Sequence, residues 1–178
     1  MLRKAVLAAL LASAVPAVAQ PAAMQLTSQE IAPGARIAMN QVYGDCNGDN
    51  VSPELSWSGA PKETKSFAIT LYDPDARFWH WIVFAISAKE HSLAAGAGDP
   101  MRTLLGAPAE EGTNDFGHVG YGGPCPPAGD APHHYRFTVW ALDSATPTFD
   151  SSITGDKIAP WLKSHALAEA TLEAIYGR

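Results

Sequence analysis

Alternating hydrophobic residues predict a half-buried strand that ends at an acidic residue. Phe67, Ile69 and Leu71 recur at every second position, and Asp73 follows on the same parity. A period of two is typical of a β-strand with one buried face. Pro74 then ends the strand, because proline has no amide hydrogen to donate to a neighbouring strand. The pattern therefore predicts that the Asp73 carboxylate lies at a strand end, on the buried face.

A second apolar run begins a few residues later and is preceded by a histidine. Residues 81–86 are apolar at every position, which is typical of a strand covered on both faces. His80 stands at the start of this strand and shares the parity of Ile82 and Phe84. The short turn before it brings Asp73 and His80 to neighbouring strand ends, where a carboxylate and an imidazole can share a pocket.

A third strand is predicted over residues 133–142, with two adjacent histidines at its start. Successive side chains of a strand point to opposite faces, so His133 and Tyr135 face together whereas His134 faces away. The preceding residues, 120–132, are so rich in glycine and proline that they favour a loop over a helix or a central strand.

The remaining segments complete a mostly β chain. We expect early strands within Gln25–Met39, an extended segment from Ser52 to Trp57, and a long surface connection over Lys89–Gly112. Apolar residues three and four positions apart predict a helix over Ile158–Tyr176, with Pro160 in its first turn. Many strands and one late helix favour an all-β or β-rich core.

The N-terminus is typical of a secretory signal peptide. Arg3 and Lys4 precede an apolar stretch from Ala5 to Val15, and Ala17-Val18-Ala19 forms a cleavage site of small residues. A retained membrane anchor is the alternative, but the apolar stretch is shorter than the ~20 residues that cross a bilayer. We therefore predict a signal peptide over residues 1–19, a single domain over residues 20–178 without a transmembrane segment, and a periplasmic or secreted protein.

Composition agrees with one domain and excludes a class of partner. The 178 residues are 47% hydrophobic, which is enough for a single core. Removing Arg3 and Lys4 with the leader leaves 10 of the 12 basic residues against 18 acidic ones, a net charge of −8. An acidic surface repels phosphate backbones, so we expect no nucleic-acid partner.

The two cysteines, Cys46 and Cys125, both lie in predicted loops. Export would place them in an oxidising compartment. We expect a disulfide between them, and the alternative is a pair of free thiols near the rim of a pocket.

Several separate motifs together resemble the phosphatidylethanolamine-binding protein family, in its bacterial and archaeal branch. In chain order they are SPELSW at 52–57, TKSFAITLYDPDA at 64–76, HW at 80–81, GYGGPCPP at 120–127, H-x-Y at 133–135 and IYGR at 175–178. The resemblance implies an antiparallel β-sandwich with peripheral helices, including a C-terminal helix. One departure is Arg77, which follows DPDA where proline is usual in the family.

The resemblance also implies a small pocket for phosphate or for a phosphorylated head group such as that of phosphatidylethanolamine. We expect Asp73 to orient His80 or His133 and to raise the pKa of that ring, so that an imidazolium meets the anion. Amide groups of the glycine-rich loop would add donors, and a tryptophan would form a wall. The expected ligand-binding residues are Asp73, Trp79, His80, Gly122, Gly123, His133 and Tyr135.

Alternatives to a binding pocket are weaker. Asp73, His80 and His133 resemble a zinc set, but no HExxH or paired CxxC motif accompanies them. The chain also lacks the GxSxG elbow of a hydrolase and the GxxxxGK[ST] loop that binds nucleotides. We therefore predict a non-catalytic binding protein without a cofactor or metal. The resemblance leaves one alternative, an extracytoplasmic inhibitor or modulator of a serine protease or another partner protein, acting through exposed loops such as residues 89–112.

Overall fold

The computed structural model describes residues 23–102, 104–145 and 148–178. The leader predicted over residues 1–19 lies outside the described residues. The described elements, in chain order, are β1 (Gln25–Thr27), the 3₁₀ helices η1 (Met39–Gln41) and η2 (Gly44–Cys46), β2 (Leu55–Ser58), β3 (Ser66–Asp73), β4 (Phe78–Ser87), β5 (Ser92–Leu93), β6 (Glu110–Glu111), β7 (His133–Leu142), α1 (Gly155–His165) and β8 (Ala166–Tyr176). Within this part of the chain, no helix has the length and apolar character needed to span a membrane.

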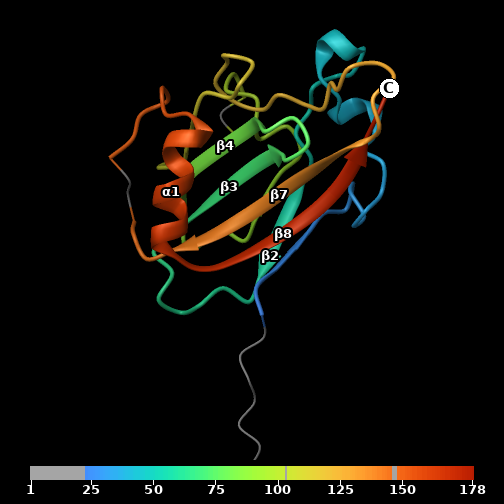
Figure 1. Cartoon of the computed structure of the whole chain (residues 1–178). Coiled ribbons are helices and arrows are strands. Elements are labelled where there is room, and N and C mark those ends of the chain that lie inside the picture. The colour runs from blue at the N-terminus through green and yellow to red at the C-terminus, as the bar shows by residue number, and fades with distance from the viewer. Residues whose placement is uncertain (1–22, 103, 146–147) are drawn as a thin grey trace, which may run out of the picture.

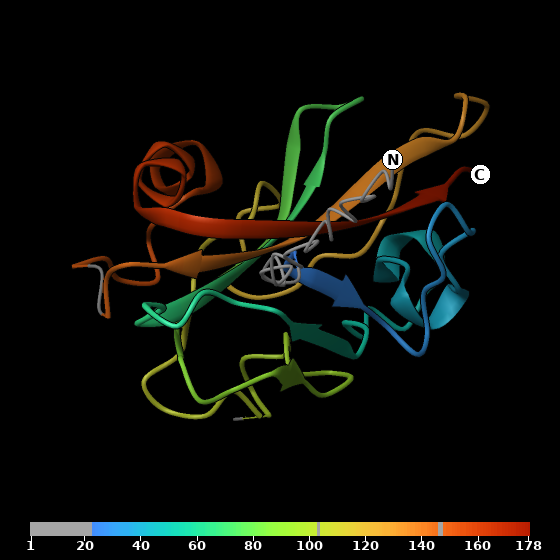
Figure 2. The same cartoon turned by 90° about the horizontal axis from the view of Figure 1, so that it is seen from below.

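The strands form two antiparallel sheets. The larger sheet has the order β6-β4-β3-β7-β8 and the smaller one the order β1-β2-β5. Figure 1 shows the larger sheet with α1 beside it, and Figure 2 shows α1 and the smaller sheet on opposite faces of the larger one. The predicted mostly β sandwich with a peripheral helix near the C-terminus is confirmed.

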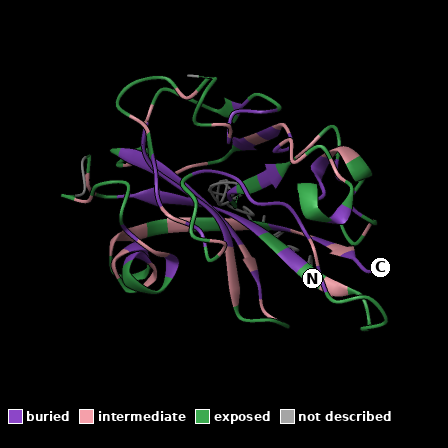
Figure 3. Cartoon of the chain, turned by 90° about the horizontal axis from the view of Figure 1, so that it is seen from above, coloured by how far each residue is buried: buried purple, intermediate pink, exposed green. Residues whose placement is uncertain are grey.

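Two hydrophobic cores hold these layers together. One lies between the sheets, where Phe67, Ile69 and Leu71 of β3 pack with Leu55 and Trp57 of β2. The other lies between the larger sheet and α1, and is built from Ala68, Ile82, Phe84, Trp140, Ile158 and Leu162 with their neighbours. Figure 3 shows the central strands buried along most of their length.

The double covering decides which strand predictions were right. For β4, burial on both faces is confirmed, since it contributes residues to both cores. For β3, the prediction of a half-buried strand was wrong, because Ala68 and Thr70 on the second face are also buried. Helix α1 covers Ala68, and Thr70 accepts a hydrogen bond from Trp140 Nε1 at 3.0 Å.

The C-terminal segment differs most from the sequence prediction. The helix expected over Ile158–Tyr176 is instead α1 followed by the eleven-residue strand β8, and Pro160 lies inside α1 rather than in its first turn. Every second residue from Ala168 to Tyr176 packs on the core between the sheets. Alanine favours helices, but pairing with the whole length of β7 outweighs that intrinsic preference.

A buried glutamate lies at the edge of the larger sheet. Glu111 of β6 is 7% exposed, and its Oε1 accepts a hydrogen bond from Trp81 Nε1 at 2.7 Å. Burial raises the pKa of Glu111 from 4.5 to about 7, and the charge of Asp99 acts in the same direction, although the Trp81 hydrogen bond opposes both. The carboxyl group therefore keeps its proton in the folded protein over a range in which the unfolded chain has lost it.

This shift predicts that the fold loses stability as the pH rises from about 4.5 to about 7. Over that range the folded state binds more protons than the unfolded state, so the free energy of unfolding falls, by about 3 kcal/mol for the shift described. Glu111→Gln should remove this part of the pH dependence, whereas Glu110→Gln, at the exposed neighbouring residue, should keep it. Urea denaturation at pH 4.5, 6 and 8 measures the difference, and equal slopes in the two variants would contradict the prediction.

Candidate ligand-binding site

Three adjacent strands bring the predicted polar residues together. Because β3 lies between β4 and β7 in the sheet, its last residue, Asp73, lies between His80, near the start of β4, and His133, the first residue of β7. These residues and Tyr135 line one cavity of about 180 Å³. The cavity is completed by Ala76, Phe78, Phe116, Cys125, Pro126 and Pro127.

The Asp73 carboxylate organises the polar side of the cavity. It is 2% exposed, and its Oδ2 accepts a hydrogen bond from Nδ1 of His133 at 2.7 Å. Its Oδ1 accepts hydrogen bonds from the backbone amides of Asp75 and Ala76 at 2.8 and 3.0 Å. These three donors compensate for the burial of the charge. Asp73 thus orients His133, one of the two histidines considered for this role.

A bulge in β4 turns His80 toward the same cavity. The register pairs Leu71 with Trp81 and Tyr72 with Trp79, so His80 is an extra residue without a partner on β3. Simple alternation predicted His80 on the face of Ile82 and Phe84, which pack toward α1. That prediction was wrong, because the extra residue reverses the alternation and brings the His80 ring to 5.3 Å from that of Tyr135.

His80 is a neutral ring with one occupied donor. Its Nδ1 lies 2.7 Å from the carbonyl oxygen of Gly122, which can only accept, so Nδ1 carries the hydrogen. Burial lowers the pKa of His80 to about 4, although this hydrogen bond and the charge of Asp73 act in the opposite direction. The expected rise in pKa therefore does not occur for His80, and its Nε2 acts as an acceptor at neutral pH.

Tyr135 offers an unused donor. The side chain is fully buried, and its hydroxyl has no hydrogen-bond partner among the described residues. Burial, followed by the charges of Asp73 and Asp75 and by the nearness of the Asp73 carboxylate to the hydroxyl, raises the pKa of Tyr135 well above its ordinary value, so the hydroxyl keeps its proton. A buried hydroxyl without a partner costs free energy. In this cavity it can be satisfied by a ligand oxygen.

The predicted parity at the start of β7 is also present in the structure. His133 and Tyr135 line the cavity together, whereas His134 is exposed and contacts Asp75, with Nδ1 and Oδ2 3.0 Å apart. His133 Nε2 lies 3.8 Å from Oδ2 of Asp130, beyond hydrogen-bonding distance. This nitrogen, when protonated, is a second donor available to a ligand.

Three other expected site residues do not contribute as predicted. Trp79 lies on the opposite face, where its ring packs on Tyr72 and its Nε1 donates to Asp156 at 2.9 Å. The Gly122 amide donates to the carbonyl oxygen of His80, and the Gly123 amide donates to Asn50 Oδ1, each at 2.8 Å. The loop amides are thus used inside the protein and shape the wall of the cavity.

The aromatic wall was missed by the sequence analysis. The ring of Phe116 lies 5.6 Å from that of His80, and the ring of Phe78 lies 4.8 Å from it. Phe78 is the first residue of β4 and lies two residues before His80, whereas Phe116 sits in the loop before β7 without any periodic signal. Arg77 is exposed and does not line the cavity, and its φ of 55° is one that proline cannot adopt.

A disulfide fixes another wall of the cavity. The structure joins Cys46 and Cys125, the pairing expected from the sequence, with Cα atoms 5.7 Å apart. Cys125 lines the cavity, and Cys46 is buried in η2. The bond thereby ties the segment around η2 to the glycine-rich and proline-rich loop that closes the site.

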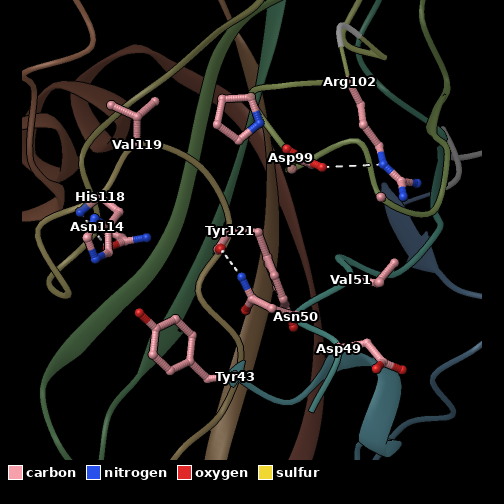
Figure 4. A pocket seen from close by; sticks show the side chains of 13 residues that line it. Tyr43, Asp49, Asn50, Val51, Asp99, Arg102, Asn114, His118, Val119 and Tyr121 are labelled. Carbon is pink, nitrogen blue, oxygen red and sulfur yellow. Dashed lines mark hydrogen bonds and ion pairs between the residues drawn. The ribbon is translucent and has the colours of Figure 1, made fainter. Parts of the chain in front are cut away.

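A larger cavity of about 340 Å³ lies beside this one (Figure 4). The rings of Tyr43, from the larger cavity, and Phe116, from the smaller one, stack with their centroids 4.1 Å apart. Its polar side chains bond mainly to the protein, since Asn50 donates to the Tyr121 carbonyl oxygen and Asp99 pairs with Arg102. We therefore place the candidate site in the smaller cavity. The described residues contain no cluster of three histidine, cysteine or acidic side chains suited to a metal ion.

Comparisons with known proteins agree with this architecture. Residues 27–177 match the family model described as phosphatidylethanolamine-binding protein. The chain is 44% identical to the UPF0098 protein YbcL of Escherichia coli over 164 residues, covering 89% of this chain and 90% of the relative. The crystal structure of YbcL, described as a new member of the mammalian PEBP family, matches with a TM-score of 0.85 and 42% identity, covering 88% of this chain and 99% of that one. A crystal structure of the Chlamydia trachomatis protein CT736, described as a putative homologue of this family, matches with a TM-score of 0.72 and 34% identity, covering 88% of this chain and 98% of that one.

The hydroxyl of Tyr135 yields a prediction with a matched control. Tyr135→Phe removes a buried hydroxyl without a protein partner, so we expect the free energy of unfolding of the ligand-free protein to rise by about 1 kcal/mol. Tyr121→Phe removes a hydroxyl that donates to the Gln41 carbonyl oxygen at 2.9 Å, so we expect a fall of about 1 kcal/mol. Chemical denaturation in a phosphate-free buffer measures both, and destabilisation by both substitutions would contradict this account of Tyr135.

Removal of the disulfide yields a second prediction. The bond closes a loop with a sequence separation of 79, so replacing Cys46 and Cys125 by serine should lower the free energy of unfolding by about 4 kcal/mol. Denaturation of the double variant and of the wild type, the latter with and without a reductant, measures this effect. Equal stability of the double variant and the oxidised wild type would show that the bond contributes nothing.

Proposed function

The chain belongs to the phosphatidylethanolamine-binding protein family, and from that premise we propose that its strand-end cavity binds a phosphoryl group, free or as part of a small head group, without catalysing a reaction. The observation that carries the proposal is the pair of donors left available in the cavity. One is the Tyr135 hydroxyl, and the other, when the His133 ring is protonated on both nitrogens, is Nε2 of that ring, which Asp73 holds in place. Oxygen atoms of a phosphoryl group accept from both.

The charge of the cavity favours a singly charged phosphoryl group. Asp73 contributes one negative charge, a His133 ring protonated on both nitrogens balances it, and His80 is neutral. The Nε2 atom of His80 acts as an acceptor and is best matched by a ligand that carries a hydrogen there, such as a P–OH group or an ammonium group. A phosphate monoanion or a head group with an amine supplies such a hydrogen. We therefore expect a phosphomonoester monoanion or a phosphoethanolamine-like group to bind better than a dianion.

The size and the walls of the cavity favour a head group over a whole lipid. Its volume of about 180 Å³ is below the roughly 300–1,000 Å³ of pockets that enclose drug-sized ligands. Phe78, Phe116, Pro126 and Pro127 form an apolar side that can pack on the carbon atoms next to a phosphoryl group. A lipid would leave its acyl chains outside this cavity.

The residues that line the cavity support binding without catalysis. Serine and threonine are not among the lining residues of this described cavity, and Cys125 is held in the disulfide. Burial keeps the Tyr135 hydroxyl protonated and therefore a poor nucleophile. His80 has its Nδ1 engaged with a backbone carbonyl group, so it does not activate a neighbouring group through that atom.

We further propose that the protein acts after export, in the periplasm or outside the cell. The support is the signal-peptide pattern of residues 1–19, together with the disulfide, since such bonds persist in oxidising compartments. A second candidate function is that of a modulator of a serine protease or another partner protein. It is favoured by one observation, the exposure of apolar side chains on the long connection, where Met101 is 88% exposed and Leu104 is 48% exposed.

Calorimetric titration of the mature chain with phosphate, phosphoethanolamine and a short-chain phosphatidylethanolamine tests the binding function. His133→Ala removes one of the two available donors, so we expect affinity to fall about 10- to 100-fold, the worth of a hydrogen bond to a charged group. Trp79→Phe is the control, because Trp79 lies on the opposite face of the sheet and its replacement should leave affinity unchanged.

Absence of saturable binding by the folded wild type, or equal affinity of the His133→Ala variant, would contradict the proposal. Inhibition of a protease that is lost on Met101→Ser but kept on His133→Ala would instead support the modulator function.

A further inference from the structure

A separate cavity of about 290 Å³ lies against the edge strand β6, and it shares no lining residue with the strand-end cavity. Its walls are largely apolar and come from the long connection and from the loop before β7. Ala97, Leu105 and Ala109 belong to or pack against the core between the sheets, and Pro100 and Val119 lie nearer the surface. Such walls can pack on a short chain of methylene groups.

Of the polar residues that line this cavity, Glu111 is the buried one, whereas Asp99, Glu110 and Ser151 are partly or fully exposed. Trp81 Nε1 occupies its Oε1, whereas its Oε2 has no hydrogen-bond donor among the described residues. Although the residue is more than nine-tenths buried, Oε2 is not among the fully enclosed polar atoms that lack a partner, so this oxygen is open to the cavity. Oε2 points toward Gly120, where an added Cβ would lie 3.5 Å from it and 2.9 Å from Cδ of Pro100. A Cβ there would also lie 2.7 Å from the carbonyl oxygen of Gly98, so glycine at this position allows the loop to pack closely beside this oxygen.

The charge around Glu111 is negative. Asp99 lines the same cavity and acts on Glu111 through its charge, and the exposed Glu110 also lines it. Arg102 lines the neighbouring cavity, where it pairs with Asp99 at 3.3 Å (Figure 4). Trp81, which packs on Glu111 from β4, carries no charge. A ligand for this cavity should therefore be positively charged.

We propose that this cavity binds a primary alkylammonium group, with the ammonium at Glu111 Oε2 and the methylene groups between the apolar walls. A guanidinium group fits less well, because its fork needs two free oxygen atoms and Trp81 occupies one of them. A hard metal cation fits less well too, since it requires several oxygen ligands and the described residues offer no such cluster. The ammonium group is a compact donor that a single free oxygen can accept from.

Binding should release a proton near neutral pH. Burial raises the pKa of Glu111 to about 7, so the carboxyl group is partly protonated there and must lose its proton to pair with an ammonium group. Affinity should therefore increase as the pH rises from 6 to 8, a range in which a primary amine remains charged. Asp99 and Glu110 line the same cavity, and we assign the change to Glu111 because burial moves its pKa into this range.

Titration of the full mature chain with n-butylammonium chloride tests the proposal, and 1-butanol is the neutral probe of similar shape. We expect saturable binding of n-butylammonium and no saturable binding of 1-butanol. In Glu111→Gln the affinity for n-butylammonium should fall by about 10-fold or more. Glu90→Gln removes the same charge from an exposed position on the same connection and should keep the wild-type affinity. A parallel titration uses the amide of lysine acetylated on its α-amino group, which keeps the side-chain ammonium. It distinguishes a free amine from a lysine side chain as the source of the group, and binding of either probe supports the proposal.

Three results would overturn it. They are equal binding of 1-butanol and n-butylammonium, unchanged affinity in Glu111→Gln, and an affinity of the wild type that does not rise with pH. The last needs no variant, so the proposal stays testable even if Glu111→Gln folds poorly. His133→Ala leaves this cavity intact, so failure here and failure of the phosphoryl-binding proposal are distinguishable.

Discussion

The buried carboxylate of Asp73 is the contact on which the candidate site depends. One oxygen holds the turn after β3 through two backbone amides, and the other holds the His133 ring from β7. A strand end, a turn and a side chain from another strand are thus fixed by one charged group that is almost fully removed from water. Loss of one of these donors would leave the buried charge less well compensated, so each donor stabilises the arrangement.

The sheet supplies the frame for this contact, and local irregularities supply its chemistry. Two cores cover β3 and β4 from opposite sides and fix their positions. The bulge at His80 then turns an imidazole into the cavity, and Gly122 bonds to both the ring and the backbone of that residue. The result is a cavity with a neutral acceptor at His80 and unused donors at Tyr135 and His133, which is a pattern that complements a partly protonated anion.

The sequence predicted the sheet-rich fold and the meeting of Asp73, His133 and Tyr135 from strand periodicity and separate motifs, whereas His80 was predicted to join them only by its nearness to a strand end and by the family resemblance. It failed where tertiary contacts outweigh local signals. The alanine-rich segment after His165 reads as a helix by spacing, but the open edge of β7 makes it a strand. The bulge at His80, the reversed position of Trp79 and the amide partners of Gly122 and Gly123 depend on register and on distant residues, which no periodic pattern encodes. Phe116 joins the cavity only through the fold of its loop.

The most direct test of the central claim is nuclear magnetic resonance of the histidine rings during a phosphate titration of the mature chain at neutral pH. The account predicts that the ring signals of His80 and His133 shift together and saturate, and that His80 keeps the neutral form with hydrogen on Nδ1 before phosphate is added. The signals of the exposed His134 and of His165, which contacts Asp143 beside α1, should stay unchanged. Saturable shifts confined to other histidines, or none at His80 and His133, would contradict the assignment of this cavity as the phosphoryl site.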